Sequence, residues 1–320
     1  MQLAPGDSGP EVAELLRRLR DAGFLSHQVA PGTAEPQTYC ELTAQAVREF
    51  QSDRGLSVTG VCDDVCWSAL LEASWSLGDR ALVLRSPNMR GDDVAELQRI
   101  LSRLGFDCGR IDGIFGPLAT RALSDFQLNS GLDVDGVCHA STVGMLKMLS
   151  RMTGDGPGIA AVRDAEEART GQPLEGRRVV VGHFGELDIL HEALSSALRE
   201  HGAMLIDMPE TDPAAQWQKA NLFGADVYVG FEADATPQAR IAYYAVPSFE
   251  SSGGRALAVL IERHLRDVVP GLQVEGMRLP VLRETKMPAV LLTLGPVETL
   301  LPRSQRIAEA IFLALIAWSS

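Results

Sequence analysis

The chain has 320 residues, of which 46% are hydrophobic and 22% are charged, a composition typical of a soluble protein long enough for two or three domains. Its formal net charge of −13 argues against nucleic-acid binding and against electrostatic attachment to a membrane surface. The first twenty residues contain neither a basic region nor an apolar core of the kind found in secretory signals, and no segment approaches the ~18 apolar residues of a transmembrane helix. We therefore expect a cytoplasmic protein without a transmembrane segment.

The cysteines are odd in number and all lie in the N-terminal half: Cys40, Cys62, Cys66, Cys108 and Cys138. An odd count without a secretory signal favours reduced thiols over disulfides. Cys62 and Cys66 are four residues apart, close enough on a helix to share a metal ion, but no second pair of Cys or His at ligand spacing completes a zinc site. We expect five free, partly buried thiols and no cofactor.

An internal repeat organises the first 150 residues. Three words recur at matching places: VAEL at 12–15 and 94–97, FQ at 50–51 and 126–127, and GLxVxGVC at 55–62 and 131–138. Within each copy the apolar residues fall at helical spacing, so each copy predicts a small bundle of three helices. We place the copies at 1–78 and 79–152, the first with a loop insertion at about 26–41, where proline and glycine interrupt the pattern.

The second copy contains the box DGIFGP at 112–117, shortly before its FQ pair. Together these words resemble the peptidoglycan-binding repeat found beside many cell-wall hydrolases. The resemblance implies a groove near Asp112, Phe115 and Arg121 that binds a muramyl peptide or a peptidoglycan precursor. The alternative is that the residues of the box build the fold. The first copy reads QTYCE at 37–41 in place of the box, so ligand binding there has less support.

Glycine and proline at 154–158 predict a linker over 153–176, within which 159–169 could form one acidic helix. From 177 to 320, short apolar strands alternate with amphipathic helices, which predicts an α/β domain with a twisted sheet flanked by helices. The expected strands are 179–181, 203–206, 225–229 and 290–294, and the expected helices are 187–201, 216–223, 254–268 and 304–318.

The last predicted strand lies in LRETKMPAVLLTLG at 282–295, which resembles the closing strand of the zinc-dependent N-acetylmuramoyl-L-alanine amidases. The word ANLFGADV at 220–227 is similar to a second motif of that family. In an active amidase the closing strand carries a Glu that moves protons for the zinc-bound water, and a His zinc ligand follows the second motif. This chain has Thr293 and Glu232 at those positions. Because a Thr hydroxyl has no useful pKa near neutrality, Thr293 cannot act as a general base. The resemblance implies an amidase-like domain without its catalytic residues.

The word VGHFG at 181–185 stands near the family's first zinc-ligand motif. His183 could be a surviving ligand, with Glu186 or His191 as a displaced second ligand and Glu232 as a third. The alternative, which we prefer, is that these are ordinary polar residues on an unused, shallow surface cleft. We therefore predict neither a metal ion nor catalysis.

Two peptidoglycan-binding-like repeats before an amidase-like domain without catalytic residues resemble a group of actinobacterial proteins. Members of that group act as cytoplasmic regulators of peptidoglycan synthesis. The resemblance implies three partners: the enolpyruvyl transferase of peptidoglycan synthesis, the lipid II flippase and a forkhead-associated-domain protein. The mycobacterial form uses a phosphorylated Thr in a C-terminal tail, which has no counterpart in this sequence. Two alternatives stay open: a divergent zinc amidase and a plain peptidoglycan-binding module.

Overall fold

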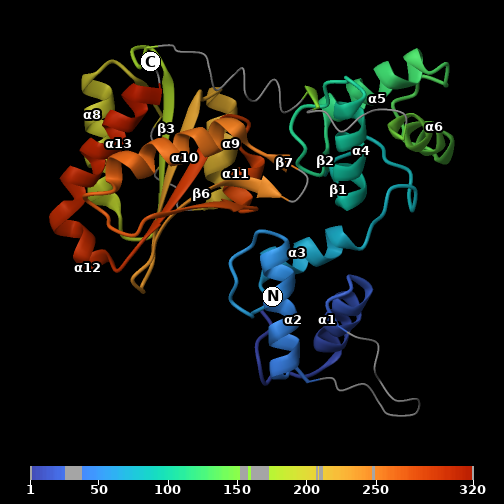
Figure 1. The fold of residues 1–320 in the computed structure, drawn as a ribbon, viewed down its shortest axis with the longest axis horizontal. Helices are drawn as coiled ribbons and strands as arrows, with labels where there is room; N and C mark the ends of the chain where they lie inside the picture. The colour runs from blue at the N-terminus through green and yellow to red at the C-terminus, as the bar shows by residue number, and fades with distance from the viewer. Residues whose placement is uncertain are drawn as a thin grey trace. The chain divides into compact units, whose positions relative to one another are not determined.

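The structure is a computed structural model, shown in Figure 1, that describes residues 2–25, 38–151, 158–159, 173–206, 208, 212–246 and 249–318. The chain divides into two compact units, Met1–Val162 and Arg163–Ser320. Most of the predicted insertion at 26–41, of the linker at 153–176 and of the acidic helix at 159–169 lies outside the described residues. None of the helices in the described part of the chain has the length and apolar character that a bilayer crossing requires.

In the described residues of the N-terminal unit, the helices form two groups of three, as the repeat predicts. The first group is α1 (Pro10–Asp21), α2 (Glu41–Asp53) and α3 (Asp64–Ala73), and the second is α4 (Asp92–Arg103), α5 (Pro117–Asn129) and α6 (Ala140–Ser150). The second group also holds two short antiparallel strands, β1 (Met89–Arg90) and β2 (Ile114–Phe115). Each group has a hydrophobic core of its own.

The Gln of each FQ pair holds the same loop in both copies. The side-chain oxygen of Gln51 accepts a hydrogen bond from the backbone N–H of Gly60 at 2.9 Å, and its amide donates to the carbonyl of Val61 at 2.8 Å. Gln127 makes the same two bonds, at 2.9 and 3.0 Å, to the equivalent glycine and valine of the second copy. Because a buried amide needs such partners, the Gln is part of the repeat's architecture.

The C-terminal unit is built on a mixed seven-stranded sheet with the order β4-β3-β5-β9-β6-β7, in which β8 also pairs with β6. The strands are β3 (Arg178–Phe184), β4 (Met204–Leu205), β5 (Val227–Ala233), β6 (Ala239–Val246), β7 (Phe249–Glu250), β8 (Gln273–Met277) and β9 (Ala289–Leu294). Strands β3, β4, β5 and β9 run parallel, and β6 is antiparallel to β9.

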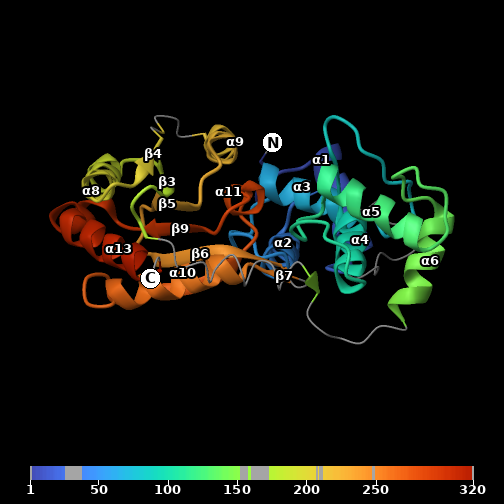
Figure 2. The ribbon, with the colours of Figure 1, turned by 90° about the horizontal axis from the view of Figure 1, so that it is seen from above.

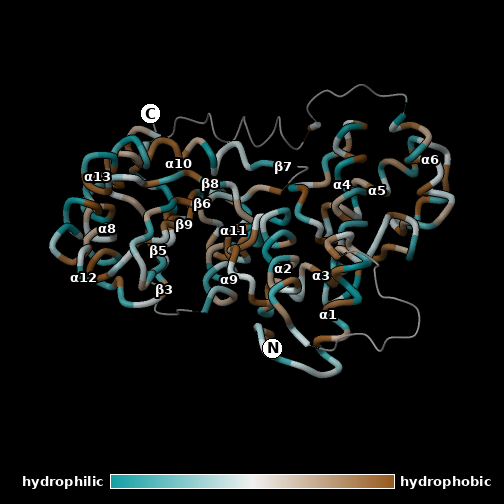
Figure 3. Tube along the Cα trace, turned by 60° about the horizontal axis from the view of Figure 1, so that its bottom comes forward, coloured by the Kyte–Doolittle hydropathy of each residue, from teal (hydrophilic) through white to brown (hydrophobic). Residues whose placement is uncertain are grey.

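Helices cover both faces of this sheet (Figure 2). On one face lie α8 (Asp188–Glu200), α10 (Ser252–Leu265) and α13 (Ser304–Trp318), and on the other lie α9 (Pro213–Phe223) and α11 (Pro280–Glu284). The hydrophobic core forms between the sheet and helices α8, α10 and α13. Figure 3 shows hydrophobic residues where β6 and β9 cross the unit. The short α12 (Val297–Leu300) links β9 to α13.

The predicted fold class is confirmed: two three-helix repeats precede an α/β domain with helices on both faces of its sheet. Each predicted strand and helix of the α/β domain is present, with ends that differ by a few residues. The sequence analysis missed β6, β7 and β8, which form one side of the sheet.

Candidate functional site

Three polar side chains form a row across neighbouring strands. Glu232 of β5 lies opposite Thr293 of β9, and Thr293 lies opposite Arg240 of β6. Residues directly opposite each other in a sheet project from the same face and lie close enough to interact. Glu232 and Thr293 are near the carboxyl ends of β5 and β9, where parallel sheets commonly place functional groups.

Hydrogen bonds connect the whole row. The Thr293 hydroxyl donates to Oε2 of Glu232 at 2.7 Å, and Nε of Arg240 donates to the Thr293 hydroxyl at 3.2 Å. The guanidinium of Arg240 also lies 3.9 Å from Oε2 of Glu232, which makes an ion pair. The Thr293 side chain is buried, and that of Glu232 is 39% exposed. The hydroxyl therefore acts as donor to the carboxylate and acceptor from the guanidinium at once.

A second buried pair fills the same face of the sheet beside this row. The Tyr228 hydroxyl donates to Gln216 at 2.6 Å, and the Gln216 amide donates to the carbonyl of His183 at 3.0 Å. The chain has glycine beneath this pair: a Cβ on Gly182 would lie 2.5 Å from the Tyr228 oxygen, and one on Gly230 would lie 2.9 Å from its ring. Burial raises the pKa of Tyr228, so its phenol stays protonated. The sheet face that carries Glu232 is therefore tightly packed at Tyr228 and Gln216.

His183 projects from the other face of the sheet. Its register places it in one row with Phe231 of β5 and Leu292 of β9, one residue away from the row of Glu232. Since alternate residues of a strand point to opposite faces, His183 and Glu232 lie on opposite sides of the sheet. The His183 ring lies 4.8 Å from that of His191 on α8, on the face covered by that helix.

The four candidate zinc ligands are therefore not brought together. His183 and His191 are neighbours, Glu186 is exposed in the loop after β3, and Glu232 is on the far face. A zinc ion at Glu232 would also lie beside the guanidinium of Arg240, a cation that would repel it. Within the described residues, no group of three or more His, Cys, Asp or Glu side chains could hold a metal ion. The residues present do not fit the zinc centre of an amidase.

The box of the second repeat is held by Gln98 of α4. The Gln98 oxygen accepts from the backbone N–H groups of Asp112 and Gly113 at 3.1 and 2.8 Å, and its amide donates to the Asp112 carboxylate at 2.9 Å. Phe115 is fully buried in the core of the repeat, whereas Arg121 is exposed on α5. Asp112 and Phe115 thus support the fold, and Arg121 is the one of the three predicted contacts that faces solvent.

The first repeat lacks this arrangement. When the VAEL words of the two copies are aligned, Leu16 takes the place of Gln98, so the amide that would hold a box is missing. Tyr39 occupies the place of Phe115: it is buried, and its hydroxyl donates to the carbonyl of Gly60 at 2.7 Å. The first repeat therefore lacks both the DGIFGP box and the glutamine that holds this box in the second repeat.

The five cysteines, all within the described residues, form no disulfide, and four of them are buried. The hydrogen-bonding interaction of the Cys66 thiol with Cys62, together with burial, raises the pKa of Cys66, which keeps that thiol protonated. Cys40 is exposed at the start of α2, and its hydrogen bond with Thr43 lowers the pKa of its thiol.

The two helical repeats and the α/β domain with the row Glu232–Thr293–Arg240 define a class of protein. In this class, peptidoglycan-binding-like repeats precede an amidase-like domain. Residues 8–70 and 90–146 match the family model described as a putative peptidoglycan binding domain. The N-acetylmuramoyl-L-alanine amidase CwlM of Mycobacterium tuberculosis is 32% identical over 331 residues, which cover 91% of this chain and 80% of that protein. The chain therefore belongs to the family of CwlM-like N-acetylmuramoyl-L-alanine amidase homologues.

Two further proteins are similar to about half of the chain. The N-acetylmuramoyl-L-alanine amidase CwlL of Bacillus licheniformis is 33% identical over 46% of this chain and 45% of its own length. The solved structure of the N-acetylmuramoyl-L-alanine amidase AmiC2 of Nostoc punctiforme is 18% identical, with a TM-score of 0.37, over 45% of this chain and 98% of that chain.

The structure adds one residue to the candidate site that the sequence analysis missed. Arg240 lies on β6, which was not predicted, although the apolar and aromatic run at 241–244 between two prolines is a strand signal. Even if β6 had been predicted, the placement of Arg240 opposite Thr293 would also have required the register between β6 and β9.

Proposed function

We propose that this chain is a non-catalytic member of the amidase family that regulates peptidoglycan synthesis in the cytoplasm. One observation carries the proposal: the buried Thr293 hydroxyl is bonded to Glu232 where the family resemblance places the proton-transfer Glu and a zinc ligand. A hydroxyl in that position offers no general base. The proposal extends to the division of the chain into 1–78, 79–152, 153–176 and 177–320, with the last segment as a pseudoenzyme domain.

The charge of Arg240 supports this reading. In a zinc amidase the metal ion supplies the positive charge beside its ligands, whereas Glu232 has a guanidinium 3.9 Å away. Because Thr293 is hydrogen-bonded on both sides and Glu232 has a cation beside it, the row does not require a metal ion to balance its charge. Such a domain retains the fold of an enzyme as a scaffold for other interactions.

We assign the interactions to two parts of the chain. The second repeat binds a muramyl-peptide precursor through its exposed surface near Arg121, beside the box anchored by Gln98. The amidase-like domain binds a protein of peptidoglycan synthesis, either the enolpyruvyl transferase or the lipid II flippase. No cofactor enters this scheme.

The test combines metal analysis with two activities of the full-length chain. We expect no stoichiometric zinc by elemental analysis, no release of peptide from muropeptides, and a higher rate of the enolpyruvyl transferase when the chain is added. The Arg121→Gln variant should bind a muramyl-peptide precursor more weakly in calorimetry while it still stimulates the transferase. Stoichiometric zinc that is lost in His183→Ala, together with peptide release, would instead establish a divergent amidase. Precursor binding without capture of the transferase or the flippase would establish a plain binding module.

A further inference from the structure

The sheet of the C-terminal unit ends in strands of unequal length. Strand β4 lies at one side, and β7 and β8, which both pair with β6, lie at the other. Strands β4 and β7 have two residues each, whereas β8 has five. Within the described residues, β6 is the only strand that pairs with β8, so the outer side of β8 has no neighbouring strand (Figure 3). Because short edge strands offer few free backbone groups, β8 is the edge that can accept another strand.

Strand β8 carries few of the features that keep edge strands from pairing with other chains. Natural edges are commonly protected by proline, lysine or a bulge. The sequence of β8 is QVEGM, without proline or lysine, and the strand pairs with β6 residue for residue from Gln273 to Met277, without a bulge. Its one charged side chain is that of Glu275, at the centre of the strand. The edge is therefore open to a partner that matches an acidic residue.

The charge of Glu275 is not matched by its surroundings. Glu275 lies opposite Ala242 of β6, a buried apolar residue. Within the described part of the chain, no cation pairs with Glu275: Arg240, two residues away along β6, is bonded to Thr293 and Glu232 instead. A cation directly opposite Glu275 on an added strand would stabilise the pairing, and a second carboxylate there would destabilise it.

The other face of β8 is apolar. Val274 packs against the hydrophobic core and lies opposite Ile241, and Gly276 lies opposite Tyr243. A Cβ on Gly276 would lie 2.6 Å from the Cβ of Ala245 and 3.4 Å from Cζ of Tyr243, so this position requires glycine. Gly276 is exposed. Because it has no side chain, the Tyr243 ring beside it is the surface that an apolar side chain of an added strand would contact.

We propose that β8 binds an extended segment of another protein by strand addition, with a lysine or arginine of that segment opposite Glu275 and apolar side chains beside Val274 and Gly276. In such pairing the backbone hydrogen bonds supply affinity, and the alternating side chains supply specificity. The net charge of −13 favours a cationic partner over a second copy of this chain. In addition, the antiparallel register of two copies that uses all five residues would place one Glu275 opposite the other. The inference goes beyond the proposed function and does not depend on it.

A fluorescently labelled peptide of the sequence Thr-Phe-Lys-Val-Thr, added to the full-length chain, tests the proposal. In antiparallel pairing its lysine lies opposite Glu275, with its phenylalanine beside Gly276 and its valine beside Val274. We expect saturable binding in fluorescence anisotropy with a Kd below about 1 mM, and slower amide hydrogen exchange at 273–277 when the peptide is bound. Two further peptides are methylated on alternate backbone nitrogens, so that each has one blocked edge. One of them should lose binding and the other should retain it, since a strand adds through one edge.

Glu275→Gln should weaken the binding of the unmethylated peptide about threefold, because a cross-strand pair of opposite charges is lost. The matched control is Glu309→Gln, which makes the same charge change at an exposed position of α13. It should change the affinity less than about 1.5-fold, because exposed charges interact weakly through solvent. Equal losses in the two variants, equal binding of the two methylated peptides, or no binding of the unmethylated peptide at millimolar concentration would overturn the proposal. A dimer in sedimentation velocity whose 273–277 amides are protected without peptide would assign the edge to a second copy and would also overturn it.

Discussion

The hydroxyl of Thr293 donates a 2.7 Å hydrogen bond to the carboxylate of Glu232, across the parallel pair β5–β9. The family resemblance implies a His and a Glu at these two positions in an active amidase. In this chain the positions hold Glu232 and Thr293, which hydrogen-bond to each other. The guanidinium of Arg240 joins them from β6. The two substitutions and this arginine thus form one polar network in place of separate catalytic groups.

This network predicts an energetic coupling between the two residues. Thr293→Val keeps the side-chain shape but removes the hydroxyl, so we expect the free energy of unfolding to fall by about 1.5–3 kcal/mol, the range for a lost hydrogen bond to a charged group. A double-mutant cycle of Thr293→Val with Glu232→Gln, measured by urea denaturation, should give a coupling energy above about 0.5 kcal/mol. Additive effects of the two substitutions would contradict the coupling.

Thr293 also corrects one expectation from the sequence. We expected Glu232 on a shallow surface cleft, but the Thr293 side chain bonded to it is only 1% exposed, because Thr293 is enclosed between Glu232 and Arg240. The sequence indicates that Thr293 replaces a carboxylate. The burial of Thr293 depends on β6, which pairs with β9 although the two strands are far apart in the sequence. Strand β6 contains none of the amidase motifs found in this chain.

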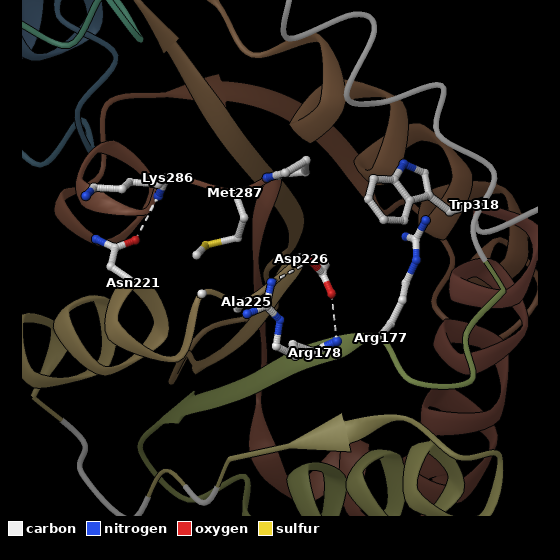
Figure 4. A pocket seen from close by; sticks show the side chains of 10 residues that line it. Arg177, Arg178, Asn221, Ala225, Asp226, Lys286, Met287 and Trp318 are labelled. Carbon is white, nitrogen blue, oxygen red and sulfur yellow. Dashed lines mark hydrogen bonds and ion pairs between the residues drawn. The ribbon is translucent and has the colours of Figure 1, made fainter. Parts of the chain in front are cut away.

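The sequence predicts the helices and the parallel strands well, because their apolar residues recur with clear periods and their ends are marked by glycine or proline. It also identifies Glu232 and Thr293 from the words around them. It cannot decide that His183 points away from Glu232, since that depends on the register of β3 against β5: a shift by one residue would reverse the face. A cavity at the amino ends of β3, β5 and β9 is equally invisible in the sequence, because Arg177, Lys286 and Trp318 line it together only in the folded sheet (Figure 4).

The anchor of the second repeat gives a further prediction. Gln98→Leu introduces the residue found at the equivalent position of the first repeat, and it removes the acceptor for two backbone N–H groups, those of Asp112 and Gly113. Buried donors without a partner cost about 1–3 kcal/mol each, so we expect the free energy of unfolding of this repeat to fall by at least about 1 kcal/mol.

The matched control for Gln98→Leu is Gln45→Leu on α2, an exposed glutamine whose side chain bonds to that of Glu49. Its effect should stay within about 0.5 kcal/mol. Thermal unfolding followed by circular dichroism measures both variants. Equal stability of Gln98→Leu and the parent chain would show that the box does not need its anchor.

The cysteines should differ sharply in reactivity. Cys40 is exposed with a lowered pKa, whereas the other four thiols are buried. With a thiol-specific chromogenic reagent at pH 8, we expect one thiol per chain to react quickly in the folded protein and all five to react after denaturation. Cys40→Ser should abolish the fast phase. Fewer than five thiols in the denatured, unreduced protein would reveal a disulfide and contradict the assignment of free thiols.

Cys138 makes the stability of the folded chain depend on alkaline pH. Burial, with a smaller contribution from the charge of Asp93, raises the pKa of this thiol from about 9 to about 12. Below pH 9 both the folded and the unfolded chain keep the proton, and the stabilisation is fully present. Between pH 9 and 12 the unfolded chain loses the proton that the folded chain retains, so stability falls by up to about 1.4 kcal/mol per pH unit for this one group.

Substitution of the thiol tests this dependence. Cys138→Ala should be less stable than the parent chain at pH 7, because buried volume is lost, but its stability should fall less steeply from pH 9 to 11. Urea denaturation at a series of pH values measures both slopes, and the difference between the two proteins removes the contributions of all other groups. Cys40→Ala is the matched control: its thiol is exposed with a lowered pKa, so its curve should not flatten as that of Cys138→Ala does. Parallel curves for Cys138→Ala and the parent chain would mean that the Cys138 thiol titrates alike in the folded and unfolded chains, contrary to its burial beside Leu82 in the core of the second repeat.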